Sequence, residues 1–201
     1  MSQNITIMKQ RLLIVLAIFF VGVSYRVEAQ DFAVKTNLLY DATATVNAGI
    51  EFGLAPRWTM DISGNYNGWQ INDGKWKHAL IQPEVRYWFC DRFAGHFIGI
   101  HGIGSAYNVG FIPNDINVLG IDLSALTDHR YQGYGYGGGI AYGYAWALSK
   151  HFNLEFEVGA GYVYTRYDKY ECTGCGKQVA DQVPYHYVGP TKAAICLVYI
   201  F

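Results

Sequence analysis

Along most of the sequence, apolar and polar side chains alternate with a period of two, which indicates β-strands rather than helices. The clearest run extends from Phe152 to Thr165, where aromatic and aliphatic side chains share one face and Glu155 and Glu157 lie on the other. A second run, from Tyr134 to Leu148, opposes large apolar side chains to a face of only Gly and Ala. Inside a narrow barrel, the room beside such a face would be filled by larger side chains from facing strands.

This alternation predicts eight strands, with boundaries good to about two to four residues. We expect them at 32–40, 46–54, 57–68, 76–90, 92–107, 131–148, 151–168 and 187–201. Short and long connections between them alternate strictly, with longer segments at 69–75, 108–130 and 169–186. Short turns at one end and longer loops at the other are typical of outer-membrane barrels. The predicted fold is therefore all-β, an eight-stranded antiparallel up-and-down transmembrane β-barrel.

The first residues have the features of an export signal. Lys9 and Arg11 precede the apolar run 12–23, and small side chains follow up to Ala29. The run is too short to span a bilayer, which takes about 20 apolar residues. We therefore predict a cleaved signal peptide at 1–29 and a barrel domain at 30–201, with an uncleaved N-terminal anchor as the alternative.

Composition narrows the class of protein further. The formal net charge is −1, which gives no electrostatic basis for a nucleic-acid partner. The 17 Tyr and 23 Gly, with only 15% charged residues, suit strands that face lipid between two aromatic bands. After residue 29 no segment approaches about 18 consecutive apolar residues, so no membrane-spanning helix is predicted.

The choice between a membrane barrel and a soluble, lipocalin-like barrel depends on which face points inward. With the Tyr, Trp, Leu and Ile faces outside, the interior receives a polar cluster. Its predicted members are Lys35, Glu51, Asp61, Gln82, Glu84, Arg86, Glu155 and Glu157. The reverse arrangement would expose a stripe of glycine and crowd large aromatic side chains into the interior, so we favour the membrane barrel.

Five blocks in the chain resemble a family of small bacterial outer-membrane barrels that is described only as a domain of unknown function. The blocks are Lys35–Thr43, Gln82–Trp88, Asp128–Gly133, Tyr167–Lys177 and Gly189–Ala193. The resemblance covers nearly all of the chain after Val34. It implies an eight-stranded barrel in the outer membrane, and it implies no known activity and no catalytic residues.

The sharpest local motif is Cys172-Thr173-Gly174-Cys175. A disulfide between Cys172 and Cys175 fits an oxidising compartment outside the cytoplasm. Half of a zinc site, with His186 as a third ligand, a redox pair and an inert reduced pair are the alternatives. Cys90 and Cys196 are predicted to lie on strands that are not neighbours, so we interpret them as lone cysteines.

The inward charges are interpreted as a plug, because an eight-stranded barrel is just wide enough for side chains to fill. Lys35 and Arg86 are too few to pair all five acids, so some acid should be neutral or solvated. A narrow channel past Glu84, Arg86 and Glu157 is one alternative. The other is a lipid-modifying enzyme with His78 and Ser105 near the outer rim, for which no supporting acid stands out.

We therefore expect a non-enzymatic protein of the bacterial outer membrane with a structural or surface-interaction role. No cofactor and no metal site are predicted. The expected partners are outer-membrane lipid, a protein that contacts the external loops, and the assembly machinery that recognises a last strand ending in Phe201. The apolar content of 108–130 favours a contact surface slightly over self-packing.

Overall fold

The computed structural model describes residues 32–71, 74–110, 117–118, 121–122, 129–171 and 178–201. The predicted signal peptide at 1–29 lies outside these residues. None of the helices in the described ranges is long and apolar enough to cross a membrane.

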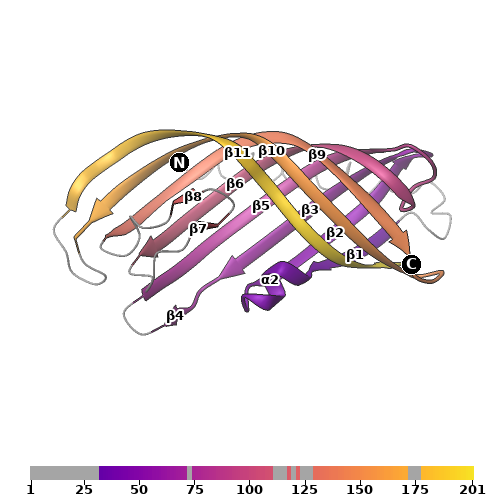
Figure 1. The fold of residues 1–201 in the computed structure, drawn as a ribbon, viewed down its shortest axis with the longest axis horizontal. Coiled ribbons are helices and arrows are strands. Elements are labelled where there is room, and N and C mark those ends of the chain that lie inside the picture. Colours follow the sequence, from indigo (N-terminus) through magenta and orange to yellow (C-terminus); the bar gives the residue numbers. More distant parts are fainter. Residues whose placement is uncertain (1–31, 72–73, 111–116, 119–120, 123–128, 172–177) are drawn as a thin grey trace, which may run out of the picture.

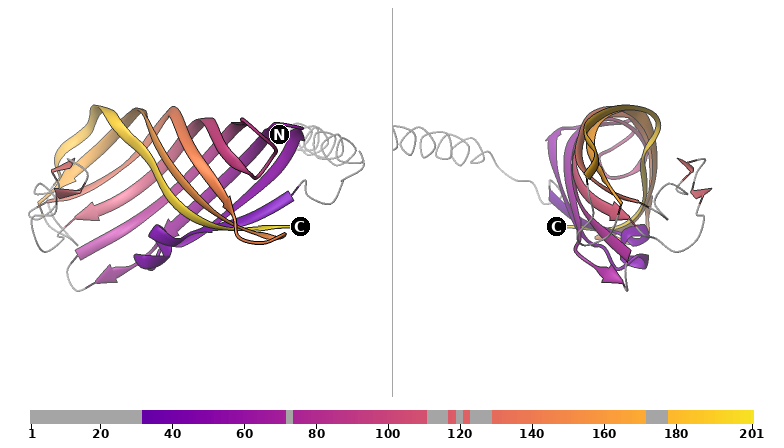
Figure 2. Two further views of the ribbon diagram at one scale, coloured as in Figure 1. Left: turned by 45° about the vertical axis from the view of Figure 1, so that its right-hand side comes forward. Right: turned by 90° about the vertical axis from the view of Figure 1, so that its left-hand side faces the viewer.

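Eight long strands form the fold, and each is antiparallel to its neighbours (Figure 1). They are β1 (Phe32–Asn37), β2 (Val46–Ala55), β3 (Trp58–Asn67), β5 (Gly74–Trp88), β6 (Gly95–Gly110), β9 (Arg130–Ala147), β10 (Phe152–Tyr170) and β11 (Gln178–Ile200). β1 pairs with β11, so the strands close into a ring that is visible end-on in Figure 2. The prediction of eight antiparallel up-and-down strands is confirmed.

Four short elements complete the described part. They are the helix α2 (Leu38–Ala42) and the two-residue strands β4 (Gln70–Ile71), β7 (Asn117–Val118) and β8 (Ile121–Asp122). Within the connection predicted at 108–130, β7 and β8 pair as a small hairpin. Most of that connection lies outside the described residues, including the surface expected to contact a partner.

Three tight turns lie together at one end of the ring, as the turn lengths predict. They join β2 to β3, β5 to β6 and β9 to β10. In the second turn, Phe93 has a positive φ of 61° and its carbonyl accepts a hydrogen bond from the Asn153 side chain. The turn is therefore fastened to β10, and Phe93 is buried against Trp88.

The strands are strongly staggered around the ring. Starting from Glu51 on β2, the residues opposite one another on successive strands are Asp61 on β3 and Glu84 on β5. Followed further around the ring, this row reaches Gly189 of β11. In the other direction, the row leads through Ala33 to Ile200, at the far end of the same strand. This displacement is the stagger that accompanies strand tilt in a closed sheet.

At the end opposite the tight turns, the wall of the ring is open on one side. β1 pairs with β11 only up to Asn37–Cys196, whereas β11 continues beside β10 to Gln178. In the described part of the chain, β11 from 178 to 195 therefore has a strand neighbour on one side only. The connection predicted at 169–186 is thus largely strand, which corrects the sequence-based boundary at 187.

One side chain continues the seam beyond the last backbone pair. The Asn37 amide donates to the Ala193 carbonyl at 3.4 Å, and its oxygen accepts from the Ile195 N–H at 3.2 Å. The same oxygen caps α2 through the Leu39 N–H. The Asn37 side chain therefore extends the contact between β1 and β11 past the last backbone pair and also caps the helix that follows.

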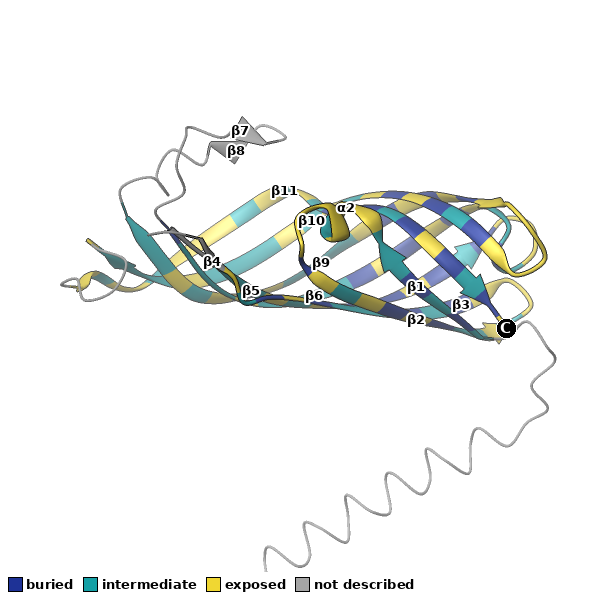
Figure 3. Ribbon diagram, turned by 90° about the horizontal axis from the view of Figure 1, so that it is seen from below, coloured by how far each residue is buried: buried dark blue, intermediate teal, exposed yellow. Residues whose placement is uncertain are grey.

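Buried and exposed residues alternate along the strands, as the colours of Figure 3 show, and the exposed ones include many large apolar side chains. Outward side chains are apolar and exposed, for example Ile100 at 71% and Ile140 at 68%. Inward side chains are buried and mostly polar. A small apolar core occupies the end with the tight turns, and its largest members are Trp88, Phe93 and Phe97.

The glycine face of β9 makes room for this core. Phe97 of the adjacent strand fills the space beside Gly143, where an added Cβ would overlap its ring and lie 2.8 Å from the Phe156 carbonyl oxygen. The expected filling of this space is thus provided, at this position, by a neighbouring strand.

Replacing Gly143 with Ala should therefore destabilise the fold by about 1–3 kcal/mol, the usual range for overpacking a core. Gly64→Ala is the matched control, because its Cβ would meet nothing closer than the Leu80 carbonyl oxygen at 3.8 Å. Urea unfolding of both variants, followed by tryptophan fluorescence, measures the difference. Equal unfolding midpoints for the two variants would show that the Phe97 ring can move aside at no cost in stability.

Candidate functional site

The ring places the predicted polar cluster in its interior. All its members are buried: Lys35, Glu51, Asp61, Gln82, Glu84, Arg86, Glu155 and Glu157. They come from β1, β2, β3, β5 and β10, and several contacts join strands that are not neighbours in the sheet. Such contacts are only possible across the inside of the ring.

Arg86 is the centre of this cluster. Its Nη1 donates to Glu51 Oε2 at 2.8 Å and to Glu155 Oε2 at 3.1 Å. Its Nη2 donates to Glu157 Oε2 at 2.8 Å, and its Nε donates to Glu84 Oε1 at 3.2 Å. A guanidinium presents its donors in a planar fork, which lets one side chain contact four carboxylates.

Lys35 holds the β1–β3 side of the network. Its ammonium donates to Glu51, and it lies 3.3 Å from Asp61 Oδ1 and 3.3 Å from Glu155 Oε2. Glu51 is further held by the Thr59 hydroxyl, which donates to Oε1 at 2.5 Å. The Thr59 hydroxyl in turn accepts from Trp88 Nε1 at 2.9 Å, which links the ion pairs to the apolar core.

Lys192 is a third cation of the network, and sequence reasoning missed it. Its ammonium contacts Glu84, lies 3.0 Å from Glu157 Oε1 and is 3.9 Å from Asp61 Oδ2. The pairing of β10 with β11 shifts between Gly159 and Ala160, where a bulge interrupts the alternation. One signal in the sequence could have found it. Lys192 and Cys196 are an even number of residues apart, so in a regular strand their side chains lie on the same face.

Glycines make space for these long side chains. A Cβ at Gly99 would overlap the Glu84 carboxylate, and one at Gly49 would lie 2.7 Å from Lys35 Cγ. The guanidinium of Arg86 also stacks over the Phe97 ring, with 4.5 Å to the ring centre. The site is thus shaped by small residues as much as by its charges.

Among the described residues, five carboxylates face three cationic side chains in this network. Glu155 Oε1 accepts no hydrogen bond there. A polar cavity of about 30 Å³ adjoins the cluster and is lined by Asp61, Glu157 and Lys192, with Tyr40 of α2 at its edge. A cavity of this size has room for one or two waters, and it lies beside Asp61 and Glu157.

A family described as "Protein of unknown function (DUF3575)" matches residues 14–201. The chain belongs to this family. No curated protein and no solved structure matches it.

In this DUF3575 chain, the two residues considered for catalysis, His78 and Ser105, lie on the neighbouring strands β5 and β6. His78 pairs with Tyr107, and Ser105 pairs with Leu80, so His78 and Ser105 lie diagonally on the same face. The Ser105 hydroxyl donates to the Gly135 carbonyl at 3.2 Å. Within the described ranges no hydrogen bond joins Ser105 to His78.

The cysteines of the DUF3575 chain fall into two groups. Cys172 and Cys175 lie outside the described residues, so the predicted disulfide stays a prediction. Cys196 is a buried free thiol on β11, and Cys90 is free and exposed in the turn after β5. In the described part of the chain, no group of His, Cys, Asp and Glu side chains could hold a metal ion.

Replacing Arg86 with Met should destabilise the fold by about 3–5 kcal/mol, because carboxylates remain buried without their partner. Glu155→Gln is the comparison, since it removes one charge from the side that is in excess and should change stability far less. Urea unfolding of each variant gives both values. Equal losses would contradict the central role of Arg86.

Proposed function

We propose that the ring is a transmembrane β-barrel of the bacterial outer membrane, and that the chain is exported through a cleaved signal peptide at 1–29. The observation that carries this proposal is the inverted burial. Charged side chains fill the interior, and large apolar side chains such as Ile100, Ile140 and Val158 stand exposed outside. Only lipid stabilises an outer wall of this kind, and a closed sheet satisfies its own backbone hydrogen bonds there.

Two aromatic bands support the same proposal. The band near the tight turns contains Trp58, Phe89, Tyr144, Trp146, Phe152 and Phe201. The band toward the other end contains Tyr66, Tyr134, Tyr136 and Tyr162. Aromatic side chains gather at the two interfaces of a membrane, with the apolar band of the barrel between them.

The proposed role is structural and adhesive rather than catalytic or conducting. The network around Arg86 joins β5 to β2 and β10 across the interior, which suits a plug. Five strands, β5, β6, β9, β10 and β11, continue beyond α2 and the end of β1 (Figure 1). Outside the cell, these extensions and their loops would form the surface available to a partner.

Fractionation tests the proposal directly. The full chain should be found in the outer membrane and should migrate differently on a detergent gel with and without boiling. Protease added to intact cells should cut within 69–75, 108–130 or the segment around 171–178. A soluble periplasmic protein would overturn the assignment, and a ligand-binding soluble β-fold would replace it.

An arginine in place of Ile140 should lower the stability of the vesicle-inserted protein by about 2–4 kcal/mol, the effect of a cation near the bilayer midplane. Ile140→Phe is the control, since an aromatic side chain remains compatible with lipid. Folding into vesicles over a urea series measures both. An unaffected Arg variant would place this face in water.

Reconstituted protein should show no steady ionic current in a planar bilayer, because ion pairs occupy the interior. Arg86→Met removes the central cation of the plug and should therefore increase the current, provided that heat-modifiability shows that the variant is folded. Regular current steps from the wild-type protein would contradict the plug and favour the narrow channel.

A further inference from the structure

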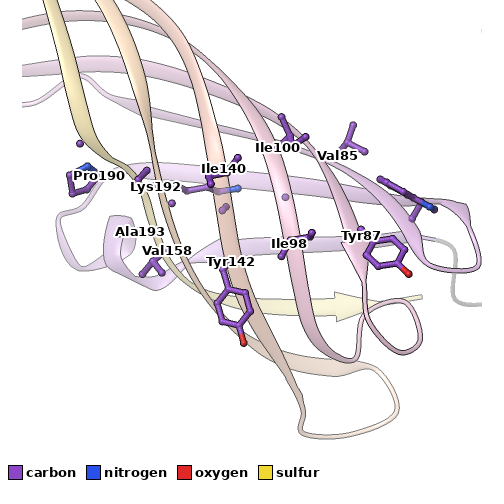
Figure 4. A pocket seen from close by; sticks show the side chains of 16 residues that line it. Val85, Tyr87, Ile98, Ile100, Ile140, Tyr142, Val158, Pro190, Lys192 and Ala193 are labelled. Carbon is purple, nitrogen blue, oxygen red and sulfur yellow. The ribbon is translucent and has the colours of Figure 1, made fainter.

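An apolar groove of about 880 Å³ crosses the outer wall of the ring. Figure 4 shows its labelled side chains running across β5, β6, β9, β10 and β11. Ile100, Ile140 and Val158 stand along it, each at least 65% exposed. The groove extends from Trp58, in the aromatic band near the tight turns, to Ala160, two residues before Tyr162 of the other band.

Small residues create the hollow. Gly99, Ala141 and Gly159 form its floor, where the side chains point inward or are absent, and Ala160 and Ala193 leave low points in its wall. The groove is lined almost only by apolar side chains and glycine, which suits the hydrocarbon chain of a lipid.

The upper end of the groove meets a polar group of side chains. At that end Ala160 pairs with Pro190, and both line the groove. Two residues further on the same face, Tyr162 contacts His186, with 2.5 Å between the Tyr162 hydroxyl and His186 Nδ1. Residues two apart along a strand are separated by about 7 Å, so this pair lies directly beyond the groove.

An arginine stands just above this pair. Arg166 is exposed and follows Tyr162 on the same face of β10. Its Nε donates to the Tyr164 hydroxyl at 2.9 Å, and its guanidinium lies over the Tyr164 ring. The guanidinium also interacts with the side chain of Tyr134. Because a guanidinium carries five N–H donors, N–H groups remain for a further acceptor.

We propose that this groove and the polar group above it bind one lipid with an anionic phosphate headgroup. The acyl chain lies along Ile140 and Val158, and the phosphate accepts hydrogen bonds from Arg166 and from Nε2 of His186. Planar guanidinium donors match the oxygens of a phosphate, which gives the charge complementarity. The proposal rests on the proposed membrane location of the ring.

The nearest acid further along β10 is Asp168, whose Oδ1 accepts a hydrogen bond from the backbone N–H of Gln182 on β11 at 2.8 Å. Tyr134 and Tyr136 of β9 pair with Arg166 and Tyr164 and add aromatic surface at the level of the headgroups. Such aromatic side chains are typical of the membrane interface.

The test uses the full chain, refolded into phosphatidylcholine nanodiscs that contain a minor fraction of phosphatidylglycerol. After transfer to mild detergent, native mass spectrometry counts the lipids that remain bound. The wild-type protein should retain phosphatidylglycerol with a preference of about tenfold, the size expected from one charge-assisted hydrogen bond.

Two kinds of variant separate the parts of the site. Arg166→Gln and His186→Gln should remove the preference for phosphatidylglycerol while leaving bound lipid detectable. Ala160→Phe should lower the retention of every lipid, because it fills the groove. The controls are Lys150→Gln in a tight turn at the opposite end and Val46→Phe on the outer face of β2, and both should behave as wild type.

The outcomes distinguish the two proposals. A heat-modifiable protein in the nanodiscs with no lipid preference, or one whose preference survives Arg166→Gln, overturns the lipid site and leaves the membrane barrel intact. A dimer in place of bound lipid also overturns it, since the groove would then be a subunit interface. A chain that stays outside the nanodiscs overturns both.

Discussion

The described part of the ring depends on placing five carboxylates and three cations together in its buried interior. Separated charges would be very unfavourable there, and only close pairing with several hydrogen bonds compensates the loss of hydration. Arg86 makes this possible because its guanidinium contacts Glu51, Glu84, Glu155 and Glu157 at once. The strands that carry these acids are thereby held at fixed positions around one side chain.

Other features of the sequence follow from this centre. Gly49 and Gly99 lack side chains because Lys35 and Glu84 occupy the space beside them. The inner face carries the buried charges, whereas large apolar side chains stand exposed on the outer face. A chain with 15% charged residues thus concentrates many of them inside the ring.

Strand number, direction and inward faces could be predicted because period-two alternation in this chain is long and regular. The segment 152–165 alone identifies Glu155 and Glu157 as inward residues. Lys192 could not be predicted in the same way, because a bulge precedes it and both faces of the following segment are apolar. The start of β11 was missed because its first residues are polar and include Pro184, a pattern that resembles a loop. The proximity of Arg166 and His186 required the register between two strands, which a single sequence does not provide.

The seam between the two terminal strands has a consequence for how the molecule is made. The Asn37 side chain that extends the seam reaches a carbonyl 156 residues away. Among the eight long strands, every other neighbouring pair is consecutive along the chain, so these hairpins can form one after another. The seam joins the first strand to the last, and its closure carries the largest entropic penalty of any contact in the ring. Until that final step, an incomplete sheet presents two unpaired edges and exposes the charges that the closed ring buries, a state that favours aggregation.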